Sequence, residues 1–146
     1  MRRPALILFV VVCFALAAAS QDPKPPEPVA EFKIPDEEIK RSNPVRRTAA
    51  SAAAGRRIWG TDCAFCHGAT GDGKGDLVEP MELKLLDYRD PEALKKFTDG
   101  ELHYIILKGK GKMPGGEARF KGEKAWHLVN YVRSLARKVA PAKSGT

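Results

Sequence analysis

The clearest hydrophobic pattern lies near the end of the chain. Residues 122–138 carry apolar side chains at helical spacing among charged ones, and Pro141 follows their end. The pattern predicts an amphipathic helix over residues 122–138 that buries one face against the rest of the fold. Its apolar stripe contains Trp126, Leu128, Val129, Val132 and Leu135, with Tyr131 beside them.

A second helix is predicted over residues 99–108, with clear signals at both ends. Thr98 and Glu101 have the spacing of a capping box, in which each side chain satisfies a free backbone N–H at the helix start. Gly109 ends the helix. The side chains expected on its buried face are Leu102, Ile105 and Ile106.

An alanine-rich stretch predicts the first helix of the folded domain, over residues 48–60. Thr48 can serve as its N-cap, and five of the next six residues are alanine, the strongest helix former. Gly55 then costs about 1 kcal/mol relative to alanine. Trp59 lies one turn later on the same face. A glycine is useful in a helix where another backbone must approach closely.

The middle of the chain predicts short elements and loops. Residues 77–89 mix apolar and charged positions without a clear period, so we expect a pocket wall with at most one turn of helix. Asp90 then caps a short helix that opens with Pro91 and runs to about residue 97. Glycines crowd residues 68–76 and 109–116, which predicts two loops. The chain shows no internal repeat, and its pattern predicts an all-α fold.

The first nineteen residues predict a targeting segment. Arg2 and Arg3 precede an apolar run over residues 5–19, and the alanines at 17–19 match a small-residue cleavage site. The run is shorter than the roughly 20 apolar residues that span a membrane. We expect cleavage after Ala19 and a periplasmic location, with an uncleaved anchor as the alternative.

Residues 20–47 are rich in proline and charge, which forbids a regular helix across them. Residues 20–30 predict a semi-extended linker. Residues 31–47 fit either a linker or a strap docked on the domain or a partner, because Phe32 and Ile34 are larger than linkers usually carry. The expected organisation is a signal peptide at 1–19, this segment at 20–47, a folded domain at 48–140 and a tail at 141–146.

Cysteine usage and charge refine this picture. Cleavage after Ala19 would remove Cys13 and leave Cys63 and Cys66 as the cysteines of the mature chain. The sequence contains 25 Lys and Arg against 18 Asp and Glu, a formal net charge of +7, and cleavage lowers it by two. A basic chain can bind nucleic acid, but export argues against that partner.

Cys63, Cys66 and His67 form a C-x-x-C-H motif, which is typical of covalent c-type haem attachment. Each thiol adds to one vinyl group of the haem and forms a thioether. The adjacent histidine is then held at the iron as the proximal ligand. The motif therefore predicts one covalently bound haem c, with Cys63 and Cys66 holding the porphyrin and His67 ligating the iron.

Other sites with similar motifs fit the sequence less well. A redox C-x-x-C belongs in a βαβ context, and no strand-rich pattern precedes Cys63. A structural zinc site needs a second ligand pair, whereas His103 and His127 are isolated. The glycine loop at 68–76 lacks the Lys-Ser/Thr ending of a phosphate-binding loop.

The order of these features resembles the class I cytochromes c, the mono-haem all-helical family, over about residues 48–138. The resemblance combines an early helix with Gly55 and Trp59, the C-x-x-C-H motif, a late Met113-Pro114 loop, and a last helix with Leu128 and Tyr131. It implies that the first and last helices cross at Gly55. The Pro-rich leader and the glycine loop resemble bacterial exported forms.

The resemblance also implies the second axial ligand. Met113 is the family's choice, and a soft thioether suits haem iron in an electron carrier. Met81 fits packing better, and His103 and His127 fit surface or hydrogen-bonded positions, although Met81, His103 or an open site stay as alternatives. The carbonyl of Pro80 is a candidate acceptor for the second ring nitrogen of His67, with a plain turn proline as the alternative.

A haem with two such ligands moves one electron without binding substrate. We therefore expect a non-enzymatic periplasmic cytochrome, a monomer if free, between a quinol-side donor and a terminal oxidase or reductase. Alternatives are a subunit of a larger oxidase or dehydrogenase at the membrane, and a haem enzyme or gas sensor with a labile sixth ligand. Lys74, Lys84, Lys110 and Lys112 form either a ring that steers acidic partners or an ordinary solvated surface.

Overall fold

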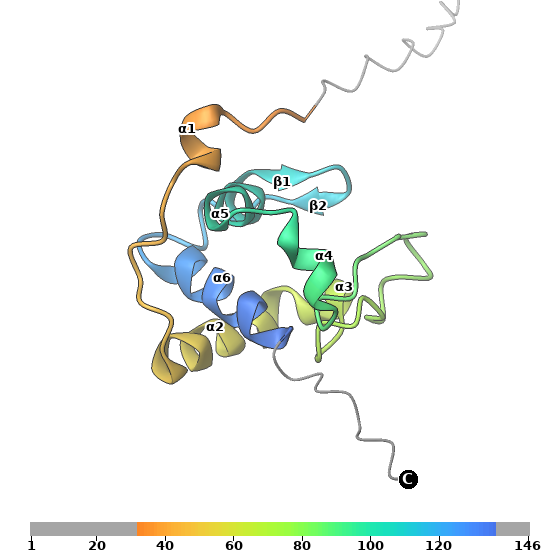
Figure 1. The fold of residues 1–146 in the computed structure, drawn as a ribbon. Helices are drawn as coiled ribbons and strands as arrows, with labels where there is room; N and C mark the ends of the chain where they lie inside the picture. The colour runs from red at the N-terminus through yellow and green to blue at the C-terminus, as the bar shows by residue number, and fades with distance from the viewer. Residues whose placement is uncertain (1–31, 137–146) are drawn as a thin grey trace, which may run out of the picture. The chain divides into compact units, whose positions relative to one another are not determined.

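Two helices that are distant in sequence cross at the centre of the fold (Figure 1). In the computed structural model, which describes residues 32–136, these are α2 (Ala49–Asp62) and α6 (Lys124–Leu135). Thr48 caps α2 as predicted, and its side chain accepts a hydrogen bond from the Ser51 backbone N–H at 3.1 Å. The predicted signal peptide, the linker over residues 20–30 and the tail at 141–146 lie outside the described residues.

Gly55 marks the crossing of α2 and α6, as predicted from the family resemblance. A Cβ atom at this position would fall on the backbone carbonyl oxygen of His127 and within 2.7 Å of the Tyr131 Cβ. The two helices therefore pack backbone to backbone, which only glycine allows at this point.

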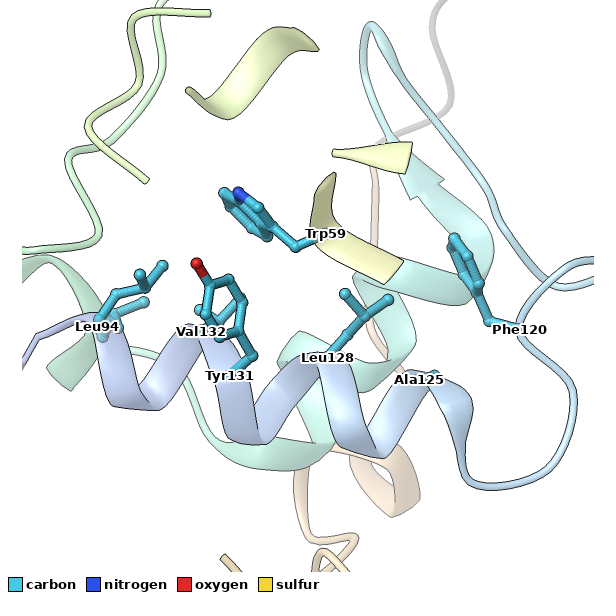
Figure 2. Close-up of a cluster of buried hydrophobic side chains, with 8 residues drawn as sticks. Trp59, Leu94, Phe120, Ala125, Leu128, Tyr131 and Val132 are labelled. Carbon is cyan, nitrogen blue, oxygen red and sulfur yellow. The ribbon is translucent and has the colours of Figure 1, made fainter. Parts of the chain in front are cut away.

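The main core lies along this helix pair. Figure 2 shows Leu128, Tyr131 and Val132 pointing from α6 toward Trp59 of α2. Trp59 is 3% exposed, and its ring meets the Tyr131 ring edge-on at 5.5 Å. Every residue of the predicted α6 stripe is buried, which confirms that pattern.

Three shorter helices lie between α2 and α6 in the chain, namely α3 (Ala64–His67), α4 (Pro91–Lys95) and α5 (Asp99–Lys108). The predicted caps are confirmed. The Asp90 side chain accepts from the Glu92 N–H at 2.9 Å, and Thr98 and Glu101 form both hydrogen bonds of the capping box. Residues 77–89 contain turns and extended chain without a helix, in agreement with the expected pocket wall.

The second glycine loop folds as a small antiparallel hairpin rather than as an irregular loop. Strands β1 (Gly109–Lys110) and β2 (Met113–Pro114) pair with Lys110 directly opposite Met113. Gly111 occupies the turn with φ 57°, a left-handed conformation that a tight hairpin turn requires. A two-residue strand has no periodicity that a sequence pattern could show, so the loop prediction missed it.

Residues 32–47 lie against the domain as a docked strap, which includes α1 (Asp36–Ile39) beside α5 (Figure 1). The Thr98 hydroxyl donates to the Ile39 carbonyl at 2.8 Å. A Cβ on Gly100 would fall on the Glu38 carbonyl oxygen, so the strap backbone touches the α5 backbone. The sequence left open a linker or a docked strap for this segment, and in the structure it is a docked strap.

A buried asparagine connects the strap to both crossing helices. Asn130 of α6 is 3% exposed, and its amide nitrogen donates to the Val45 carbonyl at 3.1 Å and to the Ser51 hydroxyl at 2.7 Å. Its side-chain oxygen accepts from the Asn43 side chain at 2.9 Å. Since burying an unpaired amide is costly, these bonds fix the strap in register with α2 and α6.

The remaining two histidines lie in different surroundings. His127 is hydrogen-bonded as expected, with Nδ1 2.9 Å from the Ser51 hydroxyl. His103 contradicts the surface expectation, because it is 5% exposed and stacks on Trp126 at 3.8 Å. Burial lowers its pKa to about 4, so the ring is neutral. Among residues 32–136, no helix has the length and apolar character that crossing a membrane requires.

Candidate functional site

The C-x-x-C-H motif occupies the tight junction between α2 and α3. Cys63 ends α2 and begins α3, and its carbonyl accepts from the backbone N–H groups of Cys66 at 3.2 Å and His67 at 2.9 Å. These bonds bring the two thiols and the imidazole onto one turn of chain. Both cysteines are half-buried and free of any disulfide.

The three motif residues line one cavity of about 510 Å³ together with Met113. The site residues predicted from sequence are therefore brought together, although the motif and Met113 are distant in the chain. This volume is in the range of roughly 300–1,000 Å³ that is typical of cofactor sites. The other wall comes from residues 77–85 and from Ile106, Pro114 and Phe120.

The first glycine loop holds the motif turn from outside. The backbone N–H groups of Gly73, Gly75 and Leu77 donate to the carbonyls of His67, Cys66 and Phe65, at 2.9, 3.1 and 2.9 Å. The Trp59 indole N–H donates to the Gly68 carbonyl at 3.0 Å. These bonds satisfy the carbonyls at the end of the motif turn and fix the loop that leads into the pocket wall.

His67 is held between aromatic rings. Its imidazole stacks on Tyr88 at 5.3 Å between centroids and lies 5.6 Å from the Trp59 ring. Burial lowers the pKa of His67, which keeps the ring neutral, the form that can ligate a metal. Its Nδ1 is buried without a hydrogen-bond partner among the described residues.

The predicted acceptor for His67, the carbonyl of Pro80, is wrong in this structure. Pro80 is exposed, and no hydrogen bond joins it to the His67 ring. Stacking on Tyr88 orients His67 instead.

The electrostatic surroundings of the thiols favour their neutral form. Burial raises the pKa of the Cys63 thiol to about 12, with a further contribution from the Asp62 carboxylate beside it. Asp62 in turn pairs with Arg119 at 3.2 Å across the cavity rim. A thiol of this kind is unlike the low-pKa nucleophile of a redox dithiol.

The two methionines of the described domain face the same cavity. Met113 is half-buried on β2, whereas Met81 is 38% exposed on the wall formed by residues 77–85. The interpretation of Met81 as a packing residue is therefore wrong, because its side chain lines the pocket rather than the core. The Lys112 ammonium donates to the Met81 carbonyl at 2.6 Å and joins this wall to the hairpin. His103, an alternative ligand, is absent from the cavity lining.

A family model described as cytochrome c oxidase, cbb3-type, subunit III matches residues 50–132, which is more than half of the chain. The chain belongs to this family of c-type cytochromes. The match spans α2, the C-x-x-C-H turn, the cavity wall, the hairpin and most of α6.

Two solved structures are similar to parts of this chain. One chain of the reducing HAO-like protein complex of Kuenenia stuttgartiensis is 25% identical, with a TM-score of 0.54, and the match covers 63% of this chain and 46% of that chain. Cytochrome c6 of the diatom Phaeodactylum tricornutum is 25% identical, with a TM-score of 0.45 over 59% of this chain and 94% of that chain. The cytochrome thus spans less than half the length of the first of these.

This c-type cytochrome carries one covalent haem c, as its family does, and has the predicted class I cytochrome c fold. The described residues fit that cofactor. The cavity has a suitable volume, two thiols on one turn and a neutral buried imidazole. Among residues 32–136, no three His, Cys, Asp or Glu side chains cluster as metal ligands.

Sequence reasoning missed several residues of the site. Tyr88 belongs to the expected pocket wall, but its stacking on His67 gave no signal, because aromatic residues in a loop carry no periodicity. The ion pair of Asp62 and Arg119 joins positions that are far apart in sequence. The side of the pocket that Met81 lines depends on the path of residues 77–85, which no local motif specifies.

Proposed function

We propose that this cytochrome is a periplasmic carrier that moves one electron through a haem closed on both faces. Cys63 and Cys66 attach the haem, and His67 and Met113 ligate its iron. The observation that carries the proposal is the single cavity that joins the C-x-x-C-H turn to Met113. Export would give a mature chain that begins near Ser20, which N-terminal sequencing of the periplasmic fraction checks.

Met113 is the better ligand of the two methionines because its backbone is fixed. It pairs across the hairpin with Lys110, and the chain after it is held by bonds from Gly116 N–H to the Ile106 carbonyl at 3.0 Å and from Glu117 N–H to the Leu107 carbonyl at 3.1 Å. Met81 lies in a turn rather than in a paired strand, where its N–H donates to the Leu77 carbonyl at 3.2 Å and its carbonyl accepts from the flexible Lys112 side chain. A pre-organised ligand loses less conformational entropy on binding.

The bound haem supplies reversible one-electron chemistry, and the protein side chains control access to it. Ile106, Leu83 and Leu85 give the cavity part of its apolar lining. Tyr88 and Trp59 keep the His67 ring in place. If His67 and Met113 both ligated the iron, no position would remain for a substrate, which favours a carrier over an enzyme or gas sensor.

Spectroelectrochemical titration of the holoprotein tests this proposal. We expect one reversible step that follows the Nernst equation for a single electron, with the absorption band of methionine–ferric ligation in the oxidised form. Transfer of two electrons, or a ferric spectrum without the methionine band, would contradict it.

The surface around the cavity fits a transient redox partner with acidic groups. Phe65 is 57% exposed between the two cysteines, and Leu77, whose N–H donates to the Phe65 carbonyl, and Met81 are also exposed. Four basic and two acidic side chains line the cavity, namely Lys84, Lys110, Lys112 and Arg119 against Asp62 and Glu82. An apolar centre with a basic rim favours brief contact with an acidic partner.

Charge reversal at this rim should change the rate of electron exchange with small charged reagents. Lys84→Glu is expected to slow oxidation by the hexacyanoferrate(III) anion about threefold at low ionic strength and to speed exchange with cationic hexaammineruthenium. Added salt should remove both effects. Lys40→Glu, on the strap and outside the cavity lining, is the matched control. Equal effects of the two variants would contradict the steering role.

The role of a subunit in a larger complex stays as a second candidate. It is supported by the description of the matching family as an oxidase subunit and by the likeness to one chain of a reducing complex. Copurification of the native protein with a membrane complex would favour this role over a free shuttle.

A further inference from the structure

The docked strap, residues 32–47, packs along α5 and α6, and its first residue reaches the β1–β2 hairpin that carries Met113. Residues 32–47 are fixed at several points along α5 and α6, so the strap is part of the fold rather than a loose leader. The contacts at its first residue reach the ligand hairpin itself.

The anchoring of the strap is specific and mostly polar. Arg47 donates to both oxygens of Asp99, at 2.8 and 2.6 Å, and the same carboxylate accepts from Arg133 of α6 at 2.9 Å. Val45 packs on the cluster of Leu102, Trp126 and Val129. Together with the Asn43–Asn130 bond at 2.9 Å, these contacts hold residues 43–47, whereas the bond from the Thr98 hydroxyl to the Ile39 carbonyl at 2.8 Å separately holds the part of the strap that leads to its other end.

Phe32 lies at that other end, against α5 and β1. Its ring centroid is 6.1 Å from the Tyr104 ring, and the Lys110 ammonium lies 5.4 Å above its centroid. Lys110 also lies 6.0 Å from the centroid of the Phe97 ring. The lysine is therefore shared by two aromatic faces, one from the strap and one from the domain.

Lys110 is also the hairpin partner of Met113. The two residues are directly opposite in the β1–β2 register, so their side chains share one face of the hairpin, and both line the cavity. A contact that fixes Lys110 also limits movement of the hairpin away from the cavity. Phe32 is thus two contacts away from the proposed iron ligand.

We propose that the strap braces the ligand hairpin, with Phe32 as a positioning residue that acts through Lys110 to keep Met113 at the iron. This inference rests on the proposed ligation by His67 and Met113. The brace opposes opening of the hairpin, the movement that exposes the iron to external ligands. It gives residues 32–47 a role in the redox site.

Cyanide binding to the ferric holoprotein tests the brace, because cyanide binds only while Met113 is away from the iron. Phe32→Ala is expected to tighten the apparent cyanide affinity about fivefold, which corresponds to about 1 kcal/mol. Lys33→Ala, at the neighbouring exposed position, should match the wild type. An equal affinity in Phe32→Ala and Lys33→Ala would overturn the brace.

Two further variants separate the brace from a general loss of stability. Val45→Ala loosens the strap at its core contact but does not touch the hairpin, so it should lower the melting temperature without tightening cyanide binding. In a Lys110→Ala background, Phe32→Ala should add less than twofold, since the link to Met113 is already broken.

The alternative results each have a clear meaning. Tighter cyanide binding in Val45→Ala, or an undiminished fivefold effect in the Lys110→Ala background, would overturn the brace while the carrier proposal stands. If the wild-type protein lacks the methionine–ferric band and binds cyanide at once, both the brace and the carrier proposal would be overturned.

Discussion

Replacing Met113 with alanine is expected to open the iron to external ligands and to lower the reduction potential. The affinity of the ferrous protein for carbon monoxide should rise at least about 100-fold, because the thioether no longer competes for the iron. This change corresponds to about 2.7 kcal/mol of binding free energy. The potential should fall by on the order of 0.2 V, since axial ligands control a range of roughly 0.8 V and methionine raises it. Gas titration and redox titration measure the two effects.

Met81→Ala is the matched control, because Met81 is a methionine that lines the same cavity. It should leave the iron closed and the potential close to that of the wild type. If Met81→Ala opens the iron and Met113→Ala does not, the ligand assignment must be exchanged. If neither variant changes carbon monoxide binding, the sixth ligand is not a methionine.

Replacing Gly55 with leucine is expected to destabilise the holoprotein by at least about 3 kcal/mol. Any side chain at this position meets the His127 carbonyl and the Tyr131 Cβ, and backbone atoms cannot move aside as a flexible side chain can. For a domain of this size, the loss should lower the melting temperature by more than about 10 °C. Thermal unfolding followed by circular dichroism measures the change.

Gly60→Leu tests whether this effect belongs to the crossing rather than to the helix. Gly60 lies on the same helix, and a Cβ there would meet no atom within 4 Å. Because leucine is the better helix former, Gly60→Leu should be neutral or stabilising by up to about 0.8 kcal/mol. A similar loss of stability in both variants would remove the packing argument for Gly55.

The helices could be predicted from sequence because their signals are local. The capping box of Thr98 and Glu101 lies within one turn, and the glycine that ends α5 follows directly. Asp90 and Pro91 begin α4 in the same way. Such signals act through neighbouring backbone groups, so they depend little on the rest of the fold.

The strap was only one of two interpretations that the sequence left open, and the buried polar network could not be predicted, because both depend on contacts between distant residues. Asn130 reads as an ordinary polar position of an amphipathic helix, yet it is buried and bonded to Asn43, 87 positions away. His103 is similar, since its burial follows from stacking on Trp126. No periodicity in the sequence distinguishes these residues from solvated ones.

The site was only partly predictable, because only some of its residues belong to a local motif. The C-x-x-C-H motif is a local pattern with a specific chemistry, and it identifies Cys63, Cys66 and His67 directly. Met113 was reached through the family resemblance rather than through a local rule. A pocket wall was expected over residues 77–89, but the exposure of Met81 and the failed Pro80 contact depend on the path of a loop that has no repeating pattern.

The most direct test of the account is the reduction potential of the wild-type protein with and without carbon monoxide. Carbon monoxide binds ferrous iron, so at an open site it would stabilise the reduced form and raise the potential. With His67 and Met113 on both faces of the haem, the same one-electron midpoint is expected under argon and under carbon monoxide. A midpoint that rises with carbon monoxide pressure would contradict the closed electron carrier and favour a ligand-binding haem.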